Sequence, residues 1–292
     1  ADLNNEAPPQ TLVREVTDSL DRAVTDERIK AVVLDLDGLQ GGGLAKLQTI
    51  GDKIQKVRDA GKKVIAIGSG YTRDQYYLAS RADEVIMHEL GLVYLEGYDY
   101  YRMFFRSALE KLQVDLNVFR VGEFKSFVEP FIRDDMSAED REASQVWLSG
   151  LWSAWERDVA AARKLKPGAL QSYADDLASR IEAEKGNAAR AAVNAGLVDR
   201  LMSRPDVDDY LLGLVGESKA DEGTYSAIDF RAYALATGIE QRLQDGKEHN
   251  VAIIVASGQI VDGEAAPGII GGDTLAAEIR SASVQLRGTP LG

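Results

Sequence analysis

The sequence predicts an α/β fold built on a parallel sheet, and three observations point to it. Short apolar runs such as Ala31 to Leu34 and Val64 to Ile67 are continuous rather than alternating, which is typical of strands buried on both faces. Glycine-containing turns follow these runs, and amphipathic helical stretches follow the turns. Strand, turn and helix repeating in this order indicate parallel strands joined by right-handed crossovers.

The first 120 residues carry these predicted strands and helices in alternation. Apolar residues at helical spacing predict a helix from Gln10 to Val24, before the strand from Lys30 to Leu36. A helix from Leu44 to Ala60 is predicted to stop at Gly61. Further along, the pattern predicts a helix at 72–81, strands at 84–87 and 91–94, an amphipathic helix at 101–112 and a strand at 114–120.

A mainly helical segment is predicted to begin at Ser137. Ser137 is a typical N-cap residue, and Glu139 and Asp140 place carboxylates in the first helical turn. All three tryptophans of the chain lie on this helix, at Trp147, Trp152 and Trp155. Their spacing favours a stripe in the protein core or at a subunit interface over a ligand site.

A second α/β unit is predicted to begin near the carboxyl end. The polar stretch from Asp245 to Asn250 precedes a strand-like run, Val251 to Val255. The pattern of Thr11 to Val16 recurs at Thr274 to Ile279, which makes a duplication plausible. The predicted organisation is therefore an α/β unit at 1–135, a helical segment and linker at 136–245, and the beginning of a second unit at 246–292.

Composition excludes several classes of function. The formal net charge of −13 disfavours nucleic acid and anionic membrane surfaces as partners, because both carry negative charge. The chain has no cysteine, so a disulfide, a thiolate metal site and a cysteine nucleophile are excluded. It shows no signal-peptide pattern at its start and no run long enough for a membrane span. We expect no cofactor and no metal.

Most residues that could carry out catalysis or bind a metal have a simpler structural interpretation. Neither His88 nor His249 lies in the context of a Ser-His-Asp triad, and a zinc site is disfavoured. Asp35 and Asp37 end a predicted strand, where they could hold Mg²⁺, but capping a turn is the favoured interpretation. The run from Gly41 to Gly43 lacks the spacing of a nucleotide-binding loop, so it is either a tight turn or an oxyanion-type loop.

Lys125 is the strongest catalytic candidate. It follows a predicted strand, with Phe124, Phe127 and Val128 close by in the sequence. Burial among apolar side chains lowers a lysine pKa, and a neutral amine can act as general base toward a serine hydroxyl. Because Glu123 and Glu129 would oppose that shift, the hypothesis requires both carboxylates to face away from the amine.

The segment from Val121 to Ser137 closely resembles the region around the catalytic lysine of the signal peptide peptidase A family, in its long bacterial form. Gln75 to Ser80 and Val251 to Ile279 resemble the same family. The resemblance implies a Clp protease/crotonase-like α/β fold, duplicated in tandem. It also implies a serine endopeptidase with a Ser-Lys dyad, in which Lys125 matches the general base.

The resemblance further implies a homo-tetramer at the periplasmic face of the bacterial inner membrane, with dyads completed between neighbouring subunits. Its substrates would be the remnants of cleaved signal peptides. The nucleophilic serine has no counterpart in this sequence, so the chain is expected to be a fragment that is inactive alone and lacks the membrane anchor.

Two departures from the family pattern limit what can be carried over. The place that corresponds to the nucleophile in this first half falls near Arg73, which cannot serve as one, and the Gly41–Gly43 loop would then be a relic of the duplication. The residues from Leu286 to Gly292 also depart from the family, so Thr289 is not taken as a nucleophile. Two alternatives stay open: a non-catalytic scaffold or peptide-binding half of an oligomer, and an acyl-CoA enzyme related to the crotonases.

Overall fold

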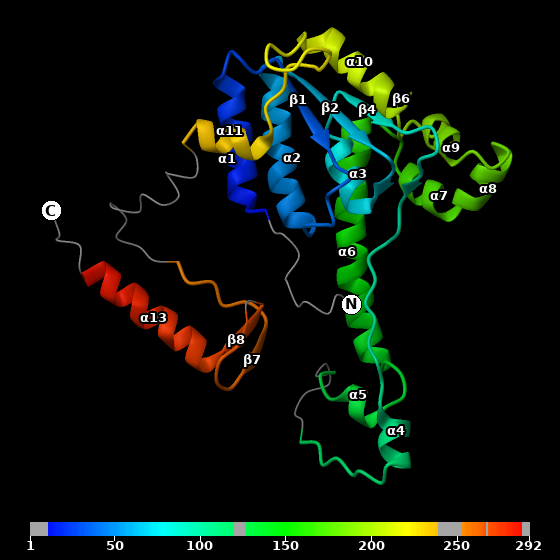
Figure 1. Ribbon diagram of the computed structural model, residues 1–292. Helices are drawn as coiled ribbons and strands as arrows, with labels where there is room; N and C mark the ends of the chain where they lie inside the picture. The colour runs from blue at the N-terminus through cyan, green and yellow to red at the C-terminus, as the bar shows by residue number, and fades with distance from the viewer. Residues whose placement is uncertain (1–10, 120–125, 239–252, 267, 288–292) are drawn as a thin grey trace. The chain divides into compact units, whose positions relative to one another are not determined.

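The computed structural model describes residues 11–119, 126–238, 253–266 and 268–287. The chain divides into two compact units, Ala1–Ile228 and Asp229–Gly292 (Figure 1). Each unit is described by itself. The three-part division expected from the sequence stays a prediction.

The first unit is organised around a parallel sheet, as the sequence predicts. Its order is β1-β2-β4-β6, and every neighbouring pair is parallel. The strands are β1 (Ala31–Asp35), β2 (Lys63–Gly68), β4 (Glu84–Met87) and β6 (Arg200–Leu201). The α/β class with helices on a parallel sheet is thereby confirmed.

Strand β2 is buried on both faces, and its side chains divide the core in two. Val64 and Ala66 belong to the larger apolar cluster, whereas Ile65 and Ile67 belong to a smaller one with Val207. This alternation is expected, because successive side chains of a strand point to opposite faces. In contrast, β1 is only half-buried over Ala31–Leu34. It pairs with β2 alone in the described sheet, so it has a neighbour on one side only.

Helices cover both faces of the sheet (Figure 1). The larger cluster contains side chains from α1 (Val13–Thr25), α2 (Leu44–Asp59), α3 (Arg73–Ala79) and α6 (Ala138–Arg163). The smaller cluster is covered by α10 (Arg204–Val215). The shorter elements of this unit are β3 (Tyr71–Thr72), β5 (Val93–Tyr94), α4 (Arg106–Lys111), α5 (Glu129–Ile132), α7 (Ala169–Asp175), α8 (Leu177–Ala183) and α9 (Ala188–Asn194).

Helix α6 begins where the sequence predicts. The Ser137 hydroxyl accepts a hydrogen bond from the backbone N–H of Asp140 at 3.1 Å, which satisfies one of the free amides of the first turn. The tryptophan stripe does not have a single environment. Trp155 is fully buried and stacks on the half-buried Trp152 at 5.1 Å, whereas Trp147 is exposed beside Tyr100.

Two predictions between β5 and α6 are wrong. The helix expected at 101–112 forms only as α4, and residues 114–119 of the expected strand have no regular structure. Val114, Leu116 and Phe119 are all exposed. Their pattern is that of a strand, but no described strand pairs with this stretch, and an isolated strand is not stable in water.

The second unit holds α11 (Phe230–Ala236), β7 (Gln259–Val261), β8 (Ile269–Gly271) and α13 (Gly272–Arg287). Strands β7 and β8 are parallel. Helix α13 includes the predicted repeat at Thr274. Of the strand expected at Val251 to Val255, the first two residues lie outside the described part, and residues 253–255 form no strand. Across the described residues, no helix has the length and apolar character to cross a membrane.

A charged cluster fixes α10 to the sheet. Glu84 on β4 accepts hydrogen bonds from Tyr210 Oη at 2.5 Å and Arg200 at 3.1 Å, and it pairs with Lys63 at 3.0 Å. Burial tends to raise the pKa of Glu84. The hydrogen bonds from Tyr210, Lys63 and Arg200 outweigh that effect, so the pKa is lowered.

We predict that Glu84→Gln lowers the free energy of unfolding by about 2 kcal/mol at neutral pH, because three donors lose a charged acceptor. The folded-state pKa is below the unfolded value, so this contribution is present above the unfolded pKa of about 4.3 and is lost as the pH falls through the folded pKa. Urea unfolding of wild type and variant across acid and neutral pH measures it. The exposed Glu89→Gln serves as control, and a difference that does not change with pH would contradict the assignment.

Candidate functional site

Lys125 lies outside the described residues, but the chain that directly follows it is well defined. Glu129 begins α5 and is 2% exposed. One oxygen of its carboxylate accepts from the Ser137 hydroxyl at 2.6 Å, and the other accepts from the Ser137 backbone N–H at 3.0 Å. Both oxygens are therefore engaged by the N-cap residue of α6. Lys125 and Glu123 are outside the described part, so the requirement that both carboxylates face away from the amine stays a prediction.

Of the apolar residues expected around Lys125, Phe127 and Val128 are described, whereas Phe124 is not. Val128 is half-buried, but the Phe127 side chain is 71% exposed. An exposed ring excludes little water, so Phe127 does not by itself provide the dry environment that lowers a lysine pKa. Closure of such a site would require further protein surface over Phe127.

The stretch between β5 and α6 is rich in exposed apolar side chains. We call residues 96–119 and 126–137 the arm, and Figure 1 shows its extended first part running beside the amino-terminal half of α6. Contacts such as the edge-on packing of Tyr100 against Trp147 at 6.0 Å attach the arm to that helix. Its exposed apolar residues, among those described, are Tyr100, Tyr101, Met103, Phe105, Leu112, Val114, Leu116, Phe119, Phe127 and Phe131. An apolar surface of this extent is typical of a surface that another protein covers.

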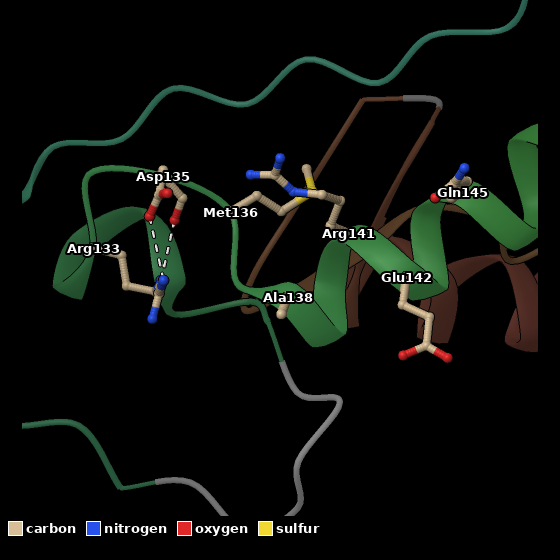
Figure 2. A pocket seen from close by; sticks show the side chains of 7 residues that line it. All are labelled: Arg133, Asp135, Met136, Ala138, Arg141, Glu142 and Gln145. Carbon is tan, nitrogen blue, oxygen red and sulfur yellow. Dashed lines mark hydrogen bonds and ion pairs between the residues drawn. The ribbon is translucent and has the colours of Figure 1, made fainter.

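A pocket of about 420 Å³ lies where the arm enters α6, and Figure 2 shows its lining. Arg133 and Asp135 form an ion pair at 3.3 Å. The Arg141 side chain lies beside Met136, and the Glu142 side chain points away from Met136 (Figure 2). Ala138 and Gln145 complete the lining. Side chains of both charges line the pocket, so its lining indicates no particular ligand.

The glycine loop of the first half faces a carboxylate of its own chain. The Gly42 backbone N–H donates to Asp74 Oδ2 at 3.4 Å. A Cβ at Gly41 would lie 3.1 Å from the same oxygen, and Gly41 has a φ of +145° that favours glycine. The Gly42 amide is thus occupied by Asp74 and is not available to an oxyanion. This agrees with the interpretation of the loop as a relic.

Arg73 stands where the resemblance would require a nucleophile, and its side chain is fully engaged. It pairs with Asp74 at 3.1 Å, donates to the Gly97 carbonyl at 2.8 Å, and lies 3.9 Å from the centre of the Tyr98 ring. Its own carbonyl accepts from the Trp155 indole at 3.2 Å. The arrangement holds α3, the arm and α6 together and offers no nucleophile.

The remaining candidates have structural roles. Asp35 accepts from the Asp37 backbone N–H at 3.4 Å, as expected for a residue that caps a turn, and it also pairs with Arg204 at 3.0 Å. Asp37 accepts from the backbone N–H and hydroxyl of Ser69 at 2.6 and 2.9 Å, which joins two loops. His88 accepts from the Leu90 backbone N–H at 3.1 Å. His249 is outside the described part. Among the residues the structure describes, no group of His, Asp and Glu could hold a metal ion.

Sequence reasoning missed two residues of this region, Asp74 and Arg102. Asp74 follows Arg73 at the start of a helix, which is an ordinary place for an acidic residue. Arg102 contacts Asp140 and two carbonyl groups that directly follow Lys125. No motif or periodicity distinguishes Arg102 from the other arginines, because its partners lie 24 to 38 residues away.

Comparisons with known proteins assign the chain to a family. The family described as "Peptidase family S49" matches residues 56–212, more than half of the chain and a range that includes Lys125. "Protease 4" of Salmonella typhi is 38% identical over 92% of this chain and 42% of its own length. "Serine protease SPPA, chloroplastic" of Arabidopsis thaliana is 26% identical over 84% of this chain and 35% of its own length.

The chain therefore spans less than half the length of these two relatives. One solved structure, a probable enoyl-CoA hydratase from Mycobacterium smegmatis, matches over 72% of this chain and 88% of its own, at 15% identity and a TM-score of 0.25. A TM-score that low does not establish a common fold. The family match over residues 56–212, in contrast, covers more than half of the chain. On the basis of this match, the chain belongs to peptidase family S49.

Proposed function

We propose that this chain is the lysine-bearing half of a serine endopeptidase that degrades cleaved signal peptides. Lys125 is the general base, and the nucleophilic serine lies outside these 292 residues. The observation that carries the proposal is the family match across residues 56–212, which includes Lys125. The name of the chloroplastic relative adds that a protein similar to this chain is a serine protease.

The chemistry suits a lysine. Neutral Lys125 would take the proton of a serine hydroxyl as its oxygen attacks the peptide carbonyl, and would return that proton to the leaving amine. Water, deprotonated by the same amine, would then attack the acyl carbon, and the amine would return the proton to the serine oxygen as that oxygen leaves. Lowering the lysine pKa to near neutrality costs about 4–5 kcal/mol. Rival bases are scarce, since the chain has no cysteine and His88 is engaged in a turn.

The dyad is completed by a second unit or by a neighbouring copy. The exposed Phe127 supports this, because an apolar partner surface over it would supply the dry environment that the chain itself leaves incomplete. The exposed apolar residues of the arm support assembly into a homo-oligomer, which we propose is a tetramer with shared dyads. We place it at the periplasmic face of the bacterial inner membrane, with remnant signal peptides as substrates and no nucleic acid partner.

A second candidate function is a non-catalytic scaffold or peptide-binding half. One observation favours it for the α/β unit taken alone: Arg73 and Asp74 fill the place of a nucleophile and its oxyanion loop. The two readings differ in what they require of Lys125, because a scaffold needs no base.

We predict that Lys125→Ala in the full-length protein lowers peptidase kcat/KM by about 10²- to 10⁴-fold, because the general base is lost. Labelling of the nucleophilic serine by a fluorophosphonate probe should slow in parallel. The exposed Lys111→Ala on α4 is the matched control and should behave as wild type. If serine labelling and peptidase activity both persist in Lys125→Ala, the proposal is refuted. The non-catalytic scaffold then remains as the interpretation of this chain.

We also predict that these 292 residues, expressed alone, show no peptidase activity, because the dyad lacks its serine. A fluorogenic peptide assay at several protein concentrations tests this. Cleavage that disappears on Lys125→Ala would place the nucleophile within this chain.

A further inference from the structure

Arg102 connects three segments that are distant in the sequence. One nitrogen of its guanidinium donates to Asp140 Oδ2 at 3.1 Å, in the first turn of α6. The other donates to the carbonyl of Ser126 at 2.8 Å and to that of Phe127 at 3.3 Å. The side chains of Arg102 and Asp140 are 14% and 11% exposed. The two carbonyls belong to the residues that directly follow Lys125.

The segment that Arg102 holds is fixed at further points. Glu129, as described above, is bound through both oxygens to Ser137. The Phe105 backbone N–H donates to the Pro130 carbonyl at 2.6 Å, and Phe105 stacks on Phe131 at 6.2 Å. The chain after Lys125 is thus bound on one side to Arg102 and Phe105 and on the other to Ser137, the cap of α6.

An arginine is well suited to this position. Its planar guanidinium presents several N–H donors at fixed angles, so it can bind a carboxylate and two carbonyls at once. Lysine at this position could reach some of these acceptors but would not hold them in a fixed relation. Removal of the cation would leave the buried Asp140 carboxylate without its ion pair.

We propose that Arg102 is a positioning residue for Lys125: by fixing the carbonyls of Ser126 and Phe127 against α6, it sets where the chain leaves the lysine. The inference rests on the proposed role of Lys125 as general base. Arg102 itself touches no substrate. A general base must lie within hydrogen-bond distance of the proton it removes, and a misplacement of about 1 Å can cost about 10²-fold in rate.

The test uses the full-length protein and three variants. Arg102→Met removes the charge and the donors, and Arg102→Lys keeps the charge. Arg106→Met is the matched control, because Arg106 is an exposed arginine of the same arm that pairs only with the neighbouring turn at Glu110, among the contacts described. The measurements are kcat and KM as functions of pH, and the rate at which an amine-reactive reagent modifies Lys125, followed by peptide mass analysis.

We expect Arg102→Met to lower kcat by about 10²-fold with little change in KM, and to move the acid limb of the pH profile. The pH dependence of Lys125 modification should move with it. Arg102→Lys should recover part of kcat, and Arg106→Met should match wild type. Hydrogen exchange of residues 126–132 should be faster in Arg102→Met, because their carbonyl anchors are lost.

The outcomes separate this inference from the proposed function. Loss of activity in Lys125→Ala, combined with a wild-type kcat, pH profile and modification rate in Arg102→Met, overturns the positioning role alone. Full activity in Lys125→Ala overturns both. A loss of stability in Arg102→Met with an unchanged kcat per folded molecule also overturns it, since a purely structural residue would behave in that way. If Arg102→Met does not fold, Arg102→Lys and Asp140→Asn replace it under the same criteria.

Discussion

Most of what surrounds the candidate site depends on how α6 is held at its two ends. At the carboxyl end, Trp155 and Val159 are fully buried in the larger core, so that end has a fixed place on the sheet. Among the described residues, no comparable apolar cluster surrounds the other end. The order there comes from polar contacts: the Ser137 cap, the Glu129 carboxylate and the Arg102–Asp140 pair. The apolar core thus fixes the helix. The described residues that follow Lys125 are in turn bound to the amino-terminal end of that helix.

In the α/β unit, the position expected for a nucleophile and the nearby glycine loop are both occupied by contacts within the chain. An amide of the glycine loop donates to Asp74, and Arg73 is engaged by Asp74, Gly97 and the Tyr98 ring. These interactions stabilise the junction of α3 with the arm. A unit so arranged contributes structure and, on our proposal, one lysine, and it leaves the nucleophile to another part of the protein.

The fold could be predicted where local patterns suffice. The apolar runs of β2 and β4, the helix from Leu44 and the cap at Ser137 follow from periodicity and capping preference, and each is present. The failures at 101–112 and 114–120 have a common cause. Their apolar residues are arranged like those of buried elements, but within the described part of the first unit no surface buries them, and the pattern alone does not show this.

The site was predictable in part. Lys125 was identified by its apolar neighbours and by the scarcity of other bases, and its assignment as a base comes from the family resemblance. The structure shows Glu129 bound to Ser137 and Phe127 exposed, whereas Lys125 lies outside the described residues and its role stays a prediction. Arg102 could not be found from the sequence, because its importance comes from contacts across tens of residues.

The length of α6 has a geometric consequence for the candidate base. Trp155 lies 18 positions after Ser137, which corresponds to about 27 Å along a helix that rises about 1.5 Å per residue. A tilt of about 5° at the buried end would therefore displace the capped end by about 2 Å. A small change in packing around Trp155 would therefore produce a larger displacement at the segment that follows Lys125.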